Sequence, residues 1–425
     1  MKTLFLCGGV GNRMFPIAED KFLLKFLGKT LLEHQIEAAR GAGLSEFIFV
    51  CNPQNVAKTE KIAKNISAIH CEFAVQKKAL GIADALGSAR HLLNSELLVV
   101  NPNDVFDGSL YAALLAERKR SCETAYITGY QVQSYFPGGY LTVNEHGRLT
   151  GIIEKPGPGH EPSDMVNLLV HLHTDPARLL SYVAAVKTER DDAYERALDR
   201  MCVDNQPVRV VPYRGTWTAI KYPWNILDAV KYFLDGAQSY LAPTASVSDR
   251  AVIDGKVVIE DGARIFENAV IRGPAYIGHR TVIGNNSLVR HYSHIGDDCV
   301  VGFGTEVKGS YVGDSCGFHM NYVGDSVLGE GCNFGAGTIT ANWRFDEKKI
   351  SVRVKDATVD TGMNKLGAMV GDNCKTGINV SIMPGVRIGS GALIGPSVCL
   401  ARDVAADSVV PGSTSPRRQR AGQLS

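Results

Sequence analysis

The chain has 425 residues, and 45 lysines and arginines against 44 aspartates and glutamates leave a net charge of +1. Nucleic-acid-binding and membrane-surface proteins normally carry a basic excess, and here only the short run from Arg417 to Arg420 is basic. No apolar stretch reaches the roughly 18 residues that span a bilayer, and the ten scattered cysteines form neither a CxxC pair nor a metal-ligand pattern. We therefore expect a cytoplasmic protein with reduced thiols that acts on small molecules and has no nucleic-acid or membrane partner.

The N-terminal half predicts an α/β domain with a mainly parallel sheet. Apolar strands are expected over residues 3–7, 46–51 and 96–100, and a helix over residues 30–40. Ligands of such sheets bind at the carboxyl ends of the strands, where a glycine turn beginning at Gly8 and the residue Asp104 both fall. This edge of the sheet is the first candidate site.

The glycine turn has the residue types of a phosphate-binding loop. Backbone N–H groups of Gly8, Gly9 and Gly11 can cradle a triphosphate because no side chain blocks its approach. Arg13 can donate to two phosphate oxygens at once, and Lys21 adds a point charge.

The C-terminal half contains a six-residue repeat. Ten positions spaced by six, from Ile253 to Val307, are all aliphatic and often followed by glycine, and strict spacing returns from Val370 to Leu400. A period of six predicts a parallel β-helix of hexapeptide repeats, in which each repeat supplies one strand and one turn. We place a first domain at residues 1–235, a linker at 236–245, the β-helix at 246–412 and a disordered tail at 413–425, with a helix over 223–240.

The N-terminal motifs resemble those of the sugar-1-phosphate nucleotidyltransferases. The segment from Gly8 to His34 reads GGVGNRMFPIAEDKFLLKFLGKTLLEH, close to the family pattern GGxGxRxxPxTxxxPKxLLPVxGKP, except that Asp20 and Lys25 stand where prolines are usual. The resemblance implies nucleotide binding by the glycine turn, Gln76 and Gly81, catalytic roles for Arg13 and Lys21, and an Mg²⁺ ligand in Asp104. It also implies contacts to the sugar phosphate from Gly139, Glu154, Lys155 and Asn167.

One metal position departs from this family. The segment WTAIKYPW from Trp217 to Trp224 resembles a W-x-D-I-G-Y-P-W segment whose aspartate (asparagine in some members) is the second metal ligand, and Ala219 occupies that position. We expect Mg²⁺ to be held by Asp104 and substrate phosphates, since Mg²⁺ takes few protein ligands.

The C-terminal motifs are similar to the acetyltransferase half of the bifunctional N-acetylglucosamine-1-phosphate uridyltransferase/glucosamine-1-phosphate N-acetyltransferase family, in its archaeal form. Two strings carry the similarity, GFHMNYVGD from Gly317 and NFGAGTITAN from Asn333. The resemblance implies a left-handed β-helix, a homotrimer, acetyl-CoA as co-substrate and His319 as the catalytic base. It implies sugar-phosphate binding by Arg290, Lys308, Tyr322, Asn333, Asn342 and Lys348, and acetyl-CoA binding near Gly377 and Gly395, although Ile378 replaces a usual serine.

Other histidines have plainer expected roles. His279, His291 and His294 are expected to be solvated corner residues, whereas His171 and His173 are expected to pack or lie on the surface rather than bind a metal.

The expected function is synthesis of UDP-N-acetylglucosamine from a nucleoside triphosphate, a sugar 1-phosphate and acetyl-CoA. Three alternatives remain open at this point. The first is a nucleotidyltransferase for glucose 1-phosphate or mannose 1-phosphate with a purely structural β-helix. The others are an acetyltransferase with a degenerate, regulatory first domain and a non-catalytic nucleotide-sugar sensor.

Overall fold

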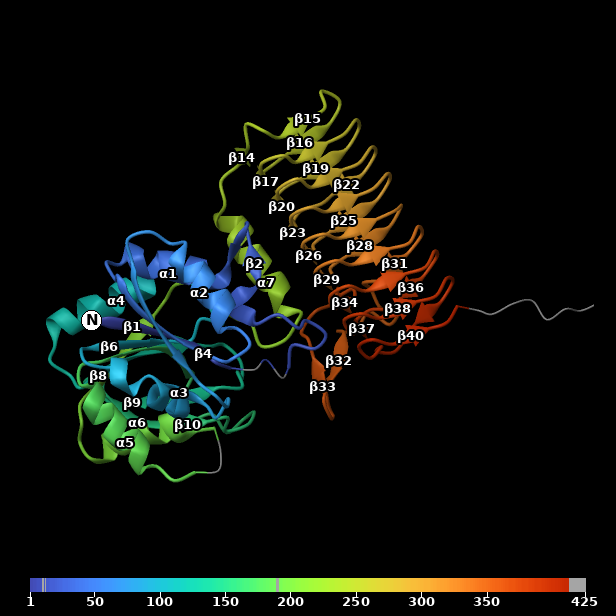
Figure 1. The fold of residues 1–425 in the computed structure, drawn as a ribbon. Coiled ribbons are helices and arrows are strands. Elements are labelled where there is room, and N and C mark those ends of the chain that lie inside the picture. The colour runs from blue at the N-terminus through green and yellow to red at the C-terminus, as the bar shows by residue number, and fades with distance from the viewer. Residues whose placement is uncertain (10, 12, 189–190, 413–425) are drawn as a thin grey trace, which may run out of the picture. The chain divides into compact units, whose positions relative to one another are not determined.

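The computed structural model describes residues 1–9, 11, 13–188 and 191–412, and it divides into two compact units (Figure 1). The first unit contains Met1–Gly11, Asp20–Leu23 and Thr30–Ala219. The second contains the other described residues, so that residues 13–19 and 24–29 belong to the unit of the β-helix. The predicted tail at 413–425 lies outside the described residues. None of the helices in the described part of the chain has the length and apolar character needed to cross a membrane.

The first unit contains a mixed sheet with helices on both faces and a separate two-stranded sheet. Its strands are β1 (Lys2–Cys7), β4 (Glu46–Cys51), β5 (His70–Val75), β6 (Leu97–Val100), β7 (Asp104–Phe106), β8 (Ala125–Gln131), β9 (Gly139–Val143), β10 (Leu149–Glu154), β11 (Met165–His173), β12 (Val208–Tyr213) and β13 (Trp217–Ala219). Its helices are η1 (Lys21–Leu23), α1 (Leu31–Gly41), α2 (Val56–Lys64), α3 (Ile82–Ser88), η2 (Arg90–Leu92), α4 (Ser109–Arg120), α5 (Pro176–Ala185) and α6 (Ala193–Val203).

The centre of this sheet is parallel and its edge is antiparallel. The strand order is β10-β9-β11-β6-β1-β4-β5, with β8 between β11 and β12. Strands β6, β1, β4 and β5 run parallel, while β11 runs antiparallel to β6 and β8. Since β1 and β6 are parallel neighbours, the turn at Gly8 and the residue Asp104 follow the same edge of the sheet, as the sequence predicted.

Alternation along the strands sends side chains into two cores. Phe5 of β1 packs with helices α1, α2 and α4 on one face, and Leu4 packs with α3, α5 and α6 on the other. Helix α1 begins with a reciprocal capping box, in which the Glu33 backbone N–H donates to Thr30 Oγ1 and the Thr30 N–H donates to the Glu33 carboxylate. Ordinary strand alternation and helix capping therefore account for the first unit.

The second unit is a three-sided parallel β-helix (Figure 1). The first side contains β14 (Tyr240–Leu241), β17 (Val257–Ile259), β20 (Ala275–Ile277), β23 (Ser293–Ile295), β26 (Tyr311–Val312), β29 (Val327–Leu328), β34 (Met369–Val370) and β37 (Arg387–Ile388). The second contains β15 (Ser246–Val247), β18 (Arg264–Ile265), β21 (Val282–Ile283), β24 (Val300–Val301), β27 (Gly317–Phe318), β30 (Asn333–Phe334), β35 (Lys375–Thr376), β38 (Leu393–Ile394) and β40 (Val409–Val410). The third contains β16 (Val252–Asp254), β19 (Val270–Arg272), β22 (Leu288–Val289), β25 (Glu306–Lys308), β28 (Tyr322–Gly324), β31 (Ile339–Thr340), β36 (Ser381–Ile382) and β39 (Cys399–Leu400).

The six-residue repeat sets the inward positions of this helix. Ile271, Ile277 and Ile283 are fully buried, and each stacks in register on an aliphatic residue of the next coil. The change of phase in the sequence corresponds to shorter coils where Val312 pairs with Leu328. The longest interruption contains the hairpin β32 (Ser351–Val354) and β33 (Ala357–Asp360). The predicted fold class, an α/β nucleotidyltransferase domain followed by a left-handed parallel β-helix, is confirmed.

Cysteines form a column inside the β-helix. Cys299, Cys316, Cys332 and Cys374 occupy equivalent positions in successive coils, and each thiol lies 3.1–3.2 Å from the backbone carbonyl oxygen of a glycine. All ten cysteines are free and most are buried, as the spacing predicted.

The segment that follows η1 packs on the β-helix within the second unit. Strand β2 (Lys25–Phe26), paired with β3 (Lys29–Thr30), places the fully buried Phe26 ring 4.9 Å from the ring of Phe233 in α7 (Asn225–Gly236). Lys25 Nζ lies 2.6 Å from Asp314 Oδ2. Lys25, one of the two departures from the nucleotidyltransferase pattern, is therefore an ion-pair partner of the β-helix corner.

Candidate active sites

The glycine turn lies against Gln76. A Cβ atom added to Gly8 would sit 2.2 Å from Gln76 Oε1, so a larger residue there would push the Gln76 amide aside. Gln76 is buried, and its Nε2 donates to the Gly81 carbonyl oxygen at 3.0 Å and to Asp84 Oδ2 at 2.9 Å. The structure thus brings together Gly8, Gln76 and Gly81, three residues predicted to bind the nucleotide. Gly9 and Gly11 are exposed beside them in sequence.

The two predicted charge-neutralising residues fall in different compact units. Lys21 begins η1 in the first unit, where the neighbouring Asp20, the other departure from the family pattern, accepts a hydrogen bond from Asn55 Nδ2 at 2.7 Å. Arg13 belongs to the second unit, and its guanidinium lies 5.8 Å from the ring centroid of Tyr222. With Arg353, Lys355 and Arg387 it lines a basic pocket of about 330 Å³.

The predicted metal ligand Asp104 is held from two sides. Trp217 Nε1 donates to Asp104 Oδ2 at 3.1 Å, and Gln35 Nε2 donates to the Asp104 backbone oxygen at 2.9 Å. Strands β7 and β13 pair antiparallel with Ala219 directly opposite Asp104. An aspartate at position 219 would therefore face Asp104, and the methyl group of Ala219 offers no metal ligand there. One fixed carboxylate suits Mg²⁺, which keeps several waters and binds one or two protein carboxylates with substrate phosphates.

The four predicted sugar contacts of the first unit converge. A Cβ atom on Gly139 would lie 3.0 Å from Glu154 Oε2 and 3.6 Å from Asn167 Cβ. Lys155 Nζ lies 2.7 Å from Glu154 Oε1. These residues come from β9, β10, the turn after β10, and β11, so three sheet strands and one turn build a single polar cluster.

Sequence reasoning missed Glu195, which lies in α6 near this cluster. The pKa of its carboxyl group is raised to about 7, mainly by burial and also by the charges of Glu154 and Asp191, while a backbone hydrogen bond and Lys155 act in the opposite direction. A raised pKa in a polar cluster is typical of functional sites. No local motif marks this residue, because the contact depends on how α6 packs against β10.

On the β-helix, three of the predicted sugar-phosphate residues share one network. Lys308 Nζ lies 2.6 and 2.7 Å from the two carboxylate oxygens of Asp325. Asn342 Nδ2 donates to the same carboxylate and, at 3.1 Å, to the Tyr322 hydroxyl oxygen. Asp325, which the sequence reasoning did not single out, therefore joins Lys308, Tyr322 and Asn342 on the third side of the helix.

Arg290 belongs to the same side and has its own acidic partner. Its Nη1 lies 2.8 Å from Glu306 Oε1, and this hydrogen bond raises the pKa of the guanidinium above its ordinary value, with Tyr322 and Asp325 adding to the effect. The row of Arg290, Glu306, Lys308 and Asp325 is thus a chain of alternating charges. A phosphate binding here would share these cations with the carboxylates.

His319 is exposed at a fixed turn after β27. Its backbone N–H donates to Asn321 Oδ1, and the buried Asn321 amide donates to the carbonyl oxygens of Gly335 and Thr338 at 2.9 and 3.1 Å. The backbone is therefore rigid while the imidazole is open to a ligand. Asn333 and Lys348 are exposed on β30 and on the loop before β32, and the structure does not bring them into the network of Lys308.

Gly377 and Gly395 stack on one another across neighbouring coils. A Cβ atom on Gly377 would meet the backbone of Pro396 at 2.6 Å, and one on Gly395 would meet the backbone of Gly412 at 2.1 Å. The stacking of coils by itself requires glycine at both positions, so their identity is explained without a ligand.

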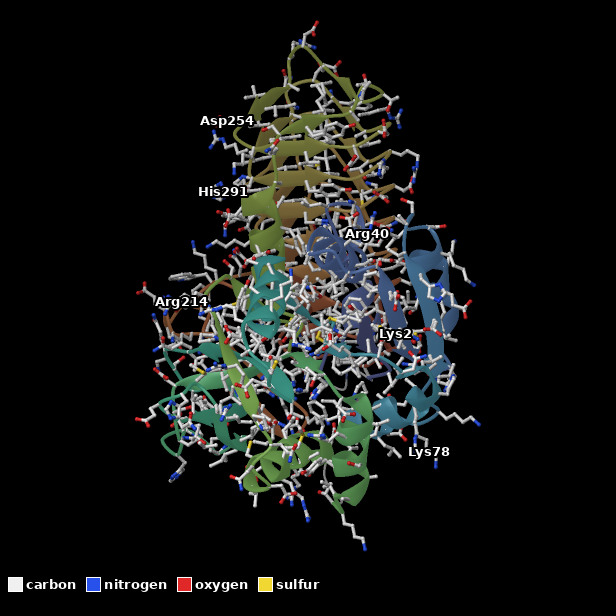
Figure 2. All side chains as sticks on the ribbon, turned by 90° about the vertical axis from the view of Figure 1, so that its left-hand side faces the viewer. Lys2, Arg40, Lys78, Arg214, Asp254 and His291 are labelled. Carbon is white, nitrogen blue, oxygen red and sulfur yellow. The ribbon has the colours of Figure 1, made fainter. Side chains whose placement is uncertain are left out.

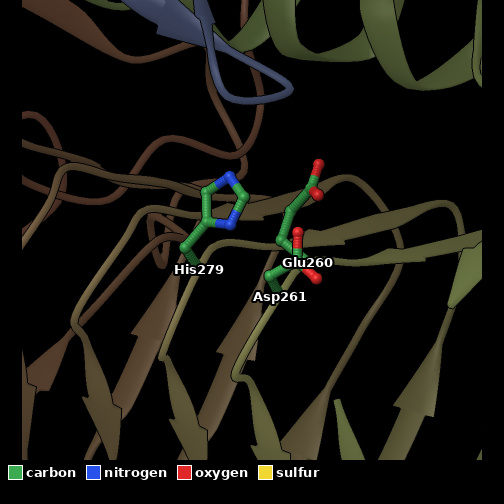
Figure 3. Close-up of side chains that lie close together, drawn as sticks. All are labelled: Glu260, Asp261 and His279. Carbon is green, nitrogen blue, oxygen red and sulfur yellow. The ribbon is translucent and has the colours of Figure 1, made fainter. Parts of the chain in front are cut away.

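The corner histidines differ from one another. His291 is exposed (Figure 2), and the half-buried His279 lies beside Glu260 and Asp261, with their ligand atoms within 4.8 Å of one another (Figure 3). The expectation for His294 is wrong, because it is 3% exposed and stacks between the rings of Tyr276 and Tyr311 at 4.7 and 5.1 Å. His171 and His173 are buried, as packing residues should be.

Each half of the chain matches a known protein family. Residues 2–219 match the nucleotidyl transferase family, and residues 256–291 and 367–402 match the bacterial transferase hexapeptide repeats. The fold and the matched segments define a nucleotidyl transferase joined to a hexapeptide-repeat transferase.

Relatives that match over nearly the whole chain define a more specific family. The chain is 35% identical, over 95% of its length and 98% of the relative's, to a bifunctional sugar-1-phosphate nucleotidylyltransferase/acetyltransferase of Sulfurisphaera tokodaii. It is 38% and 32% identical, over 96% of its length and 97% of theirs, to proteins named bifunctional protein GlmU from Methanococcus maripaludis and Methanocaldococcus jannaschii. The chain belongs to this family of bifunctional sugar-1-phosphate nucleotidylyltransferases/acetyltransferases, which confirms the resemblance.

Proposed function

We propose that the protein makes UDP-N-acetylglucosamine in two steps. Acetyl transfer from acetyl-CoA to glucosamine 1-phosphate is followed by uridylyl transfer from UTP to N-acetylglucosamine 1-phosphate. One observation carries the proposal: a single chain assembles a polar cluster around Gly139, Glu154 and Asn167 in the first unit and a second one around Lys308 and Asp325 on the β-helix. Relatives that it matches over nearly their whole length are named for both activities.

In uridylyl transfer, a phosphate oxygen of the sugar phosphate attacks the α-phosphorus of UTP and pyrophosphate leaves. The N–H groups of Gly8, Gly9 and Gly11 bind the triphosphate, and Gln76 and Gly81 bind the base. Arg13 and Lys21 neutralise the leaving charge. No general base is needed, because the attacking phosphate is already ionised at neutral pH.

The reaction needs a divalent cation, and we propose Mg²⁺. Asp104 would hold it, since Trp217 fixes one oxygen of that carboxylate. When bound, the ion neutralises charge on the phosphates. Gly139, Glu154, Lys155 and Asn167 orient the sugar phosphate.

In acetyl transfer, His319 acts as the base. The amine of glucosamine 1-phosphate attacks the thioester carbon of acetyl-CoA, the C–S bond breaks, and CoA leaves as the thiolate. His319 takes the proton released by the amine, a task that suits imidazole because its neutral form has an acceptor nitrogen. Arg290, Lys308 and Lys348 bind the phosphate, and Tyr322, Asn333 and Asn342 bind the sugar. Acetyl-CoA is proposed to lie near Gly377 and Gly395.

A homotrimer is part of the proposal. His319, Asn333 and Lys348 are exposed, and the latter two lie outside the network of Lys308 within one chain. A neighbouring β-helix would bring such residues into a shared site, so a monomer should lack acetyltransferase activity. The cytoplasmic location remains a prediction from the ten scattered thiols.

A second candidate function is acetyl transfer alone, with a degenerate first domain. Ala219 opposite Asp104 favours it, because the usual second carboxylate is missing.

Substitution of His319 tests the two-site scheme. His319→Ala should abolish CoA release from acetyl-CoA and glucosamine 1-phosphate while leaving pyrophosphate release from UTP and N-acetylglucosamine 1-phosphate intact. His291→Ala, at another exposed histidine of the β-helix, is the control and should leave both rates unchanged. Loss of both activities in His319→Ala with an unchanged oligomeric mass would overturn the scheme.

A further inference from the structure

The polar cluster of Gly139, Glu154, Lys155 and Asn167 is called the sugar cluster below. Three buried polar side chains connect it to the interior of the first unit. His171 and His173 of β11 are 0% and 1% exposed, and Tyr194 of α6 is 1% exposed. The Tyr194 hydroxyl lies 2.8 Å from His171 Nδ1 and 2.8 Å from His173 Nε2. On its other side, His171 Nε2 lies 2.7 Å from Oδ1 of Asn167, a predicted sugar contact.

Strand alternation places these groups on one face. Leu168, Val170 and Leu172 of β11 enter the core under α1, α2 and α4. Asn167, His171 and His173 therefore face the other side, which α6 covers and where Tyr194 packs. A shift of register between Leu168 and His171 lets Asn167 and His171 approach one another along the same strand.

Both imidazoles are neutral. Burial lowers the pKa of His173 to about 3 and holds the pKa of His171 well below its ordinary value, to which His173 also contributes. A neutral imidazole has one N–H donor and one acceptor nitrogen. The hydroxyl of Tyr194 has a single proton, so it donates to one histidine and accepts from the other.

The row of hydrogen bonds can run in only two directions. In the first, His173 Nε2–H donates to Tyr194, Tyr194 donates to His171 Nδ1, and His171 Nε2–H donates to Asn167 Oδ1. His173 Nδ1 is then an acceptor. In the second direction every donor and acceptor is reversed, the Asn167 amide is flipped, and His173 Nδ1 carries a proton.

The surroundings of His173 Nδ1 decide between the two directions. This atom is buried, and no hydrogen-bond partner for it occurs among the described residues. Buried N–H groups without an acceptor are rarer in proteins than buried acceptors without a donor, and each unpaired buried group costs its desolvation free energy. The first direction avoids an unpaired N–H, and it points Asn167 Oδ1 inward.

We propose that His173, Tyr194 and His171 are positioning residues that fix the side-chain amide of Asn167, so that its Nδ2–H₂ group donates to an acceptor oxygen of the sugar phosphate. The proposal rests on the proposed function, which makes Asn167 a sugar contact. It deepens that function by stating which group the site recognises. An amide held in this orientation favours a hydroxyl or carbonyl oxygen and disfavours a donor such as an ammonium group at the same position.

Histidine tautomers test the direction without any need for activity. In the full chain labelled with ¹⁵N-histidine, the ¹⁵N shifts of His171 and His173 should each show a protonated Nε2 and an unprotonated Nδ1. The signals are assigned by their loss in His171→Gln and His173→Gln. Protonated Nδ1 on both residues means that the amide is flipped, and a different tautomer on each means that the row is broken; either result overturns the proposal.

Kinetics test the consequence for the sugar. Tyr194→Phe keeps the ring and removes the hydroxyl, so the KM for N-acetylglucosamine 1-phosphate should rise about fivefold while kcat and the KM for UTP stay within twofold, as expected for one weakened hydrogen bond. Tyr126→Phe is the matched control, because the Tyr126 hydroxyl is also buried and donates to the Ser121 carbonyl oxygen at 2.5 Å, without contact to the sugar cluster.

An unchanged KM in Tyr194→Phe, or an equal rise in Tyr126→Phe, contradicts the positioning role. If the unsubstituted protein releases no pyrophosphate, the proposed function fails, and the tautomers still decide whether the row of hydrogen bonds exists as described.

Discussion

Restoring the missing carboxylate is the sharpest perturbation of the first unit. Because Ala219 is paired directly with Asp104, Ala219→Asp places two carboxylates on Cβ atoms about 5 Å apart. Without a divalent cation, both half-buried groups repel one another by about 1–2 kcal/mol. For a unit of this size that repulsion lowers the melting temperature by about 3–6 °C.

Mg²⁺ should reverse this effect. A second carboxylate tightens binding of the ion, and a ligand present at 100 times its dissociation constant stabilises the folded state by about 2.7 kcal/mol. Thermal unfolding followed by circular dichroism, in EDTA and in Mg²⁺, measures both effects. Ala219→Asn is the control of equal size without charge. If Ala219→Asp and Ala219→Asn melt alike in both buffers, position 219 does not face the metal site.

Three further predictions concern the second unit. Phe26→Ala should destabilise it by about 3–5 kcal/mol in urea unfolding, because the ring is fully buried against Phe233. Burial lowers the pKa of His294 to about 4, and the unfolded residue binds its proton near pH 6.5. Stability should therefore fall by about 2 kcal/mol from pH 7 to pH 5, with a smaller slope in His294→Phe as the check. Asp325→Asn leaves the mostly buried Lys308 without its carboxylate, so it should cost about 2–3 kcal/mol, and the double variant with Lys308→Met should cost less than the two single changes together.

Local patterns in the sequence predicted most of the architecture. The inward aliphatics such as Ile271 and Ile277 follow from a period of six, and the strand Glu46–Cys51 follows from an apolar run. Each of these signals lies within a few residues, so it can be recognised without knowing the fold.

Contacts between distant segments could not be predicted in this way. In the sequence, Lys25 is only a departure from the nucleotidyltransferase pattern. The structure shows that it forms an ion pair with the corner residue Asp314. His294 is a corner histidine by its spacing, but the rings of Tyr276 and Tyr311 bury it. Tyr194 joins the two histidines of β11 only because α6 packs across that strand.

Some residues of the candidate sites were likewise predicted from local patterns, and others depend on contacts between distant segments. His319 and Asp104 were predicted from motifs. Asp325 ends the string GFHMNYVGD but was given no role, and Glu195 lies in no motif; the charges around both residues become visible only in the structure. The role of Ala219 needed the register of β13 against β7. A sequence identifies the residue types of a site, and the pairing of strands shows which of them face each other.

Pyrophosphate release by the purified protein with Mg²⁺, UTP and N-acetylglucosamine 1-phosphate tests the central claim most directly. The two-step function predicts release, with Asp104 as the protein carboxylate at the metal despite Ala219, and loss of release in Asp104→Ala. No release with UTP, with other nucleoside triphosphates or with other sugar 1-phosphates would contradict it, and would leave acetyl transfer at His319 as the protein's chemistry.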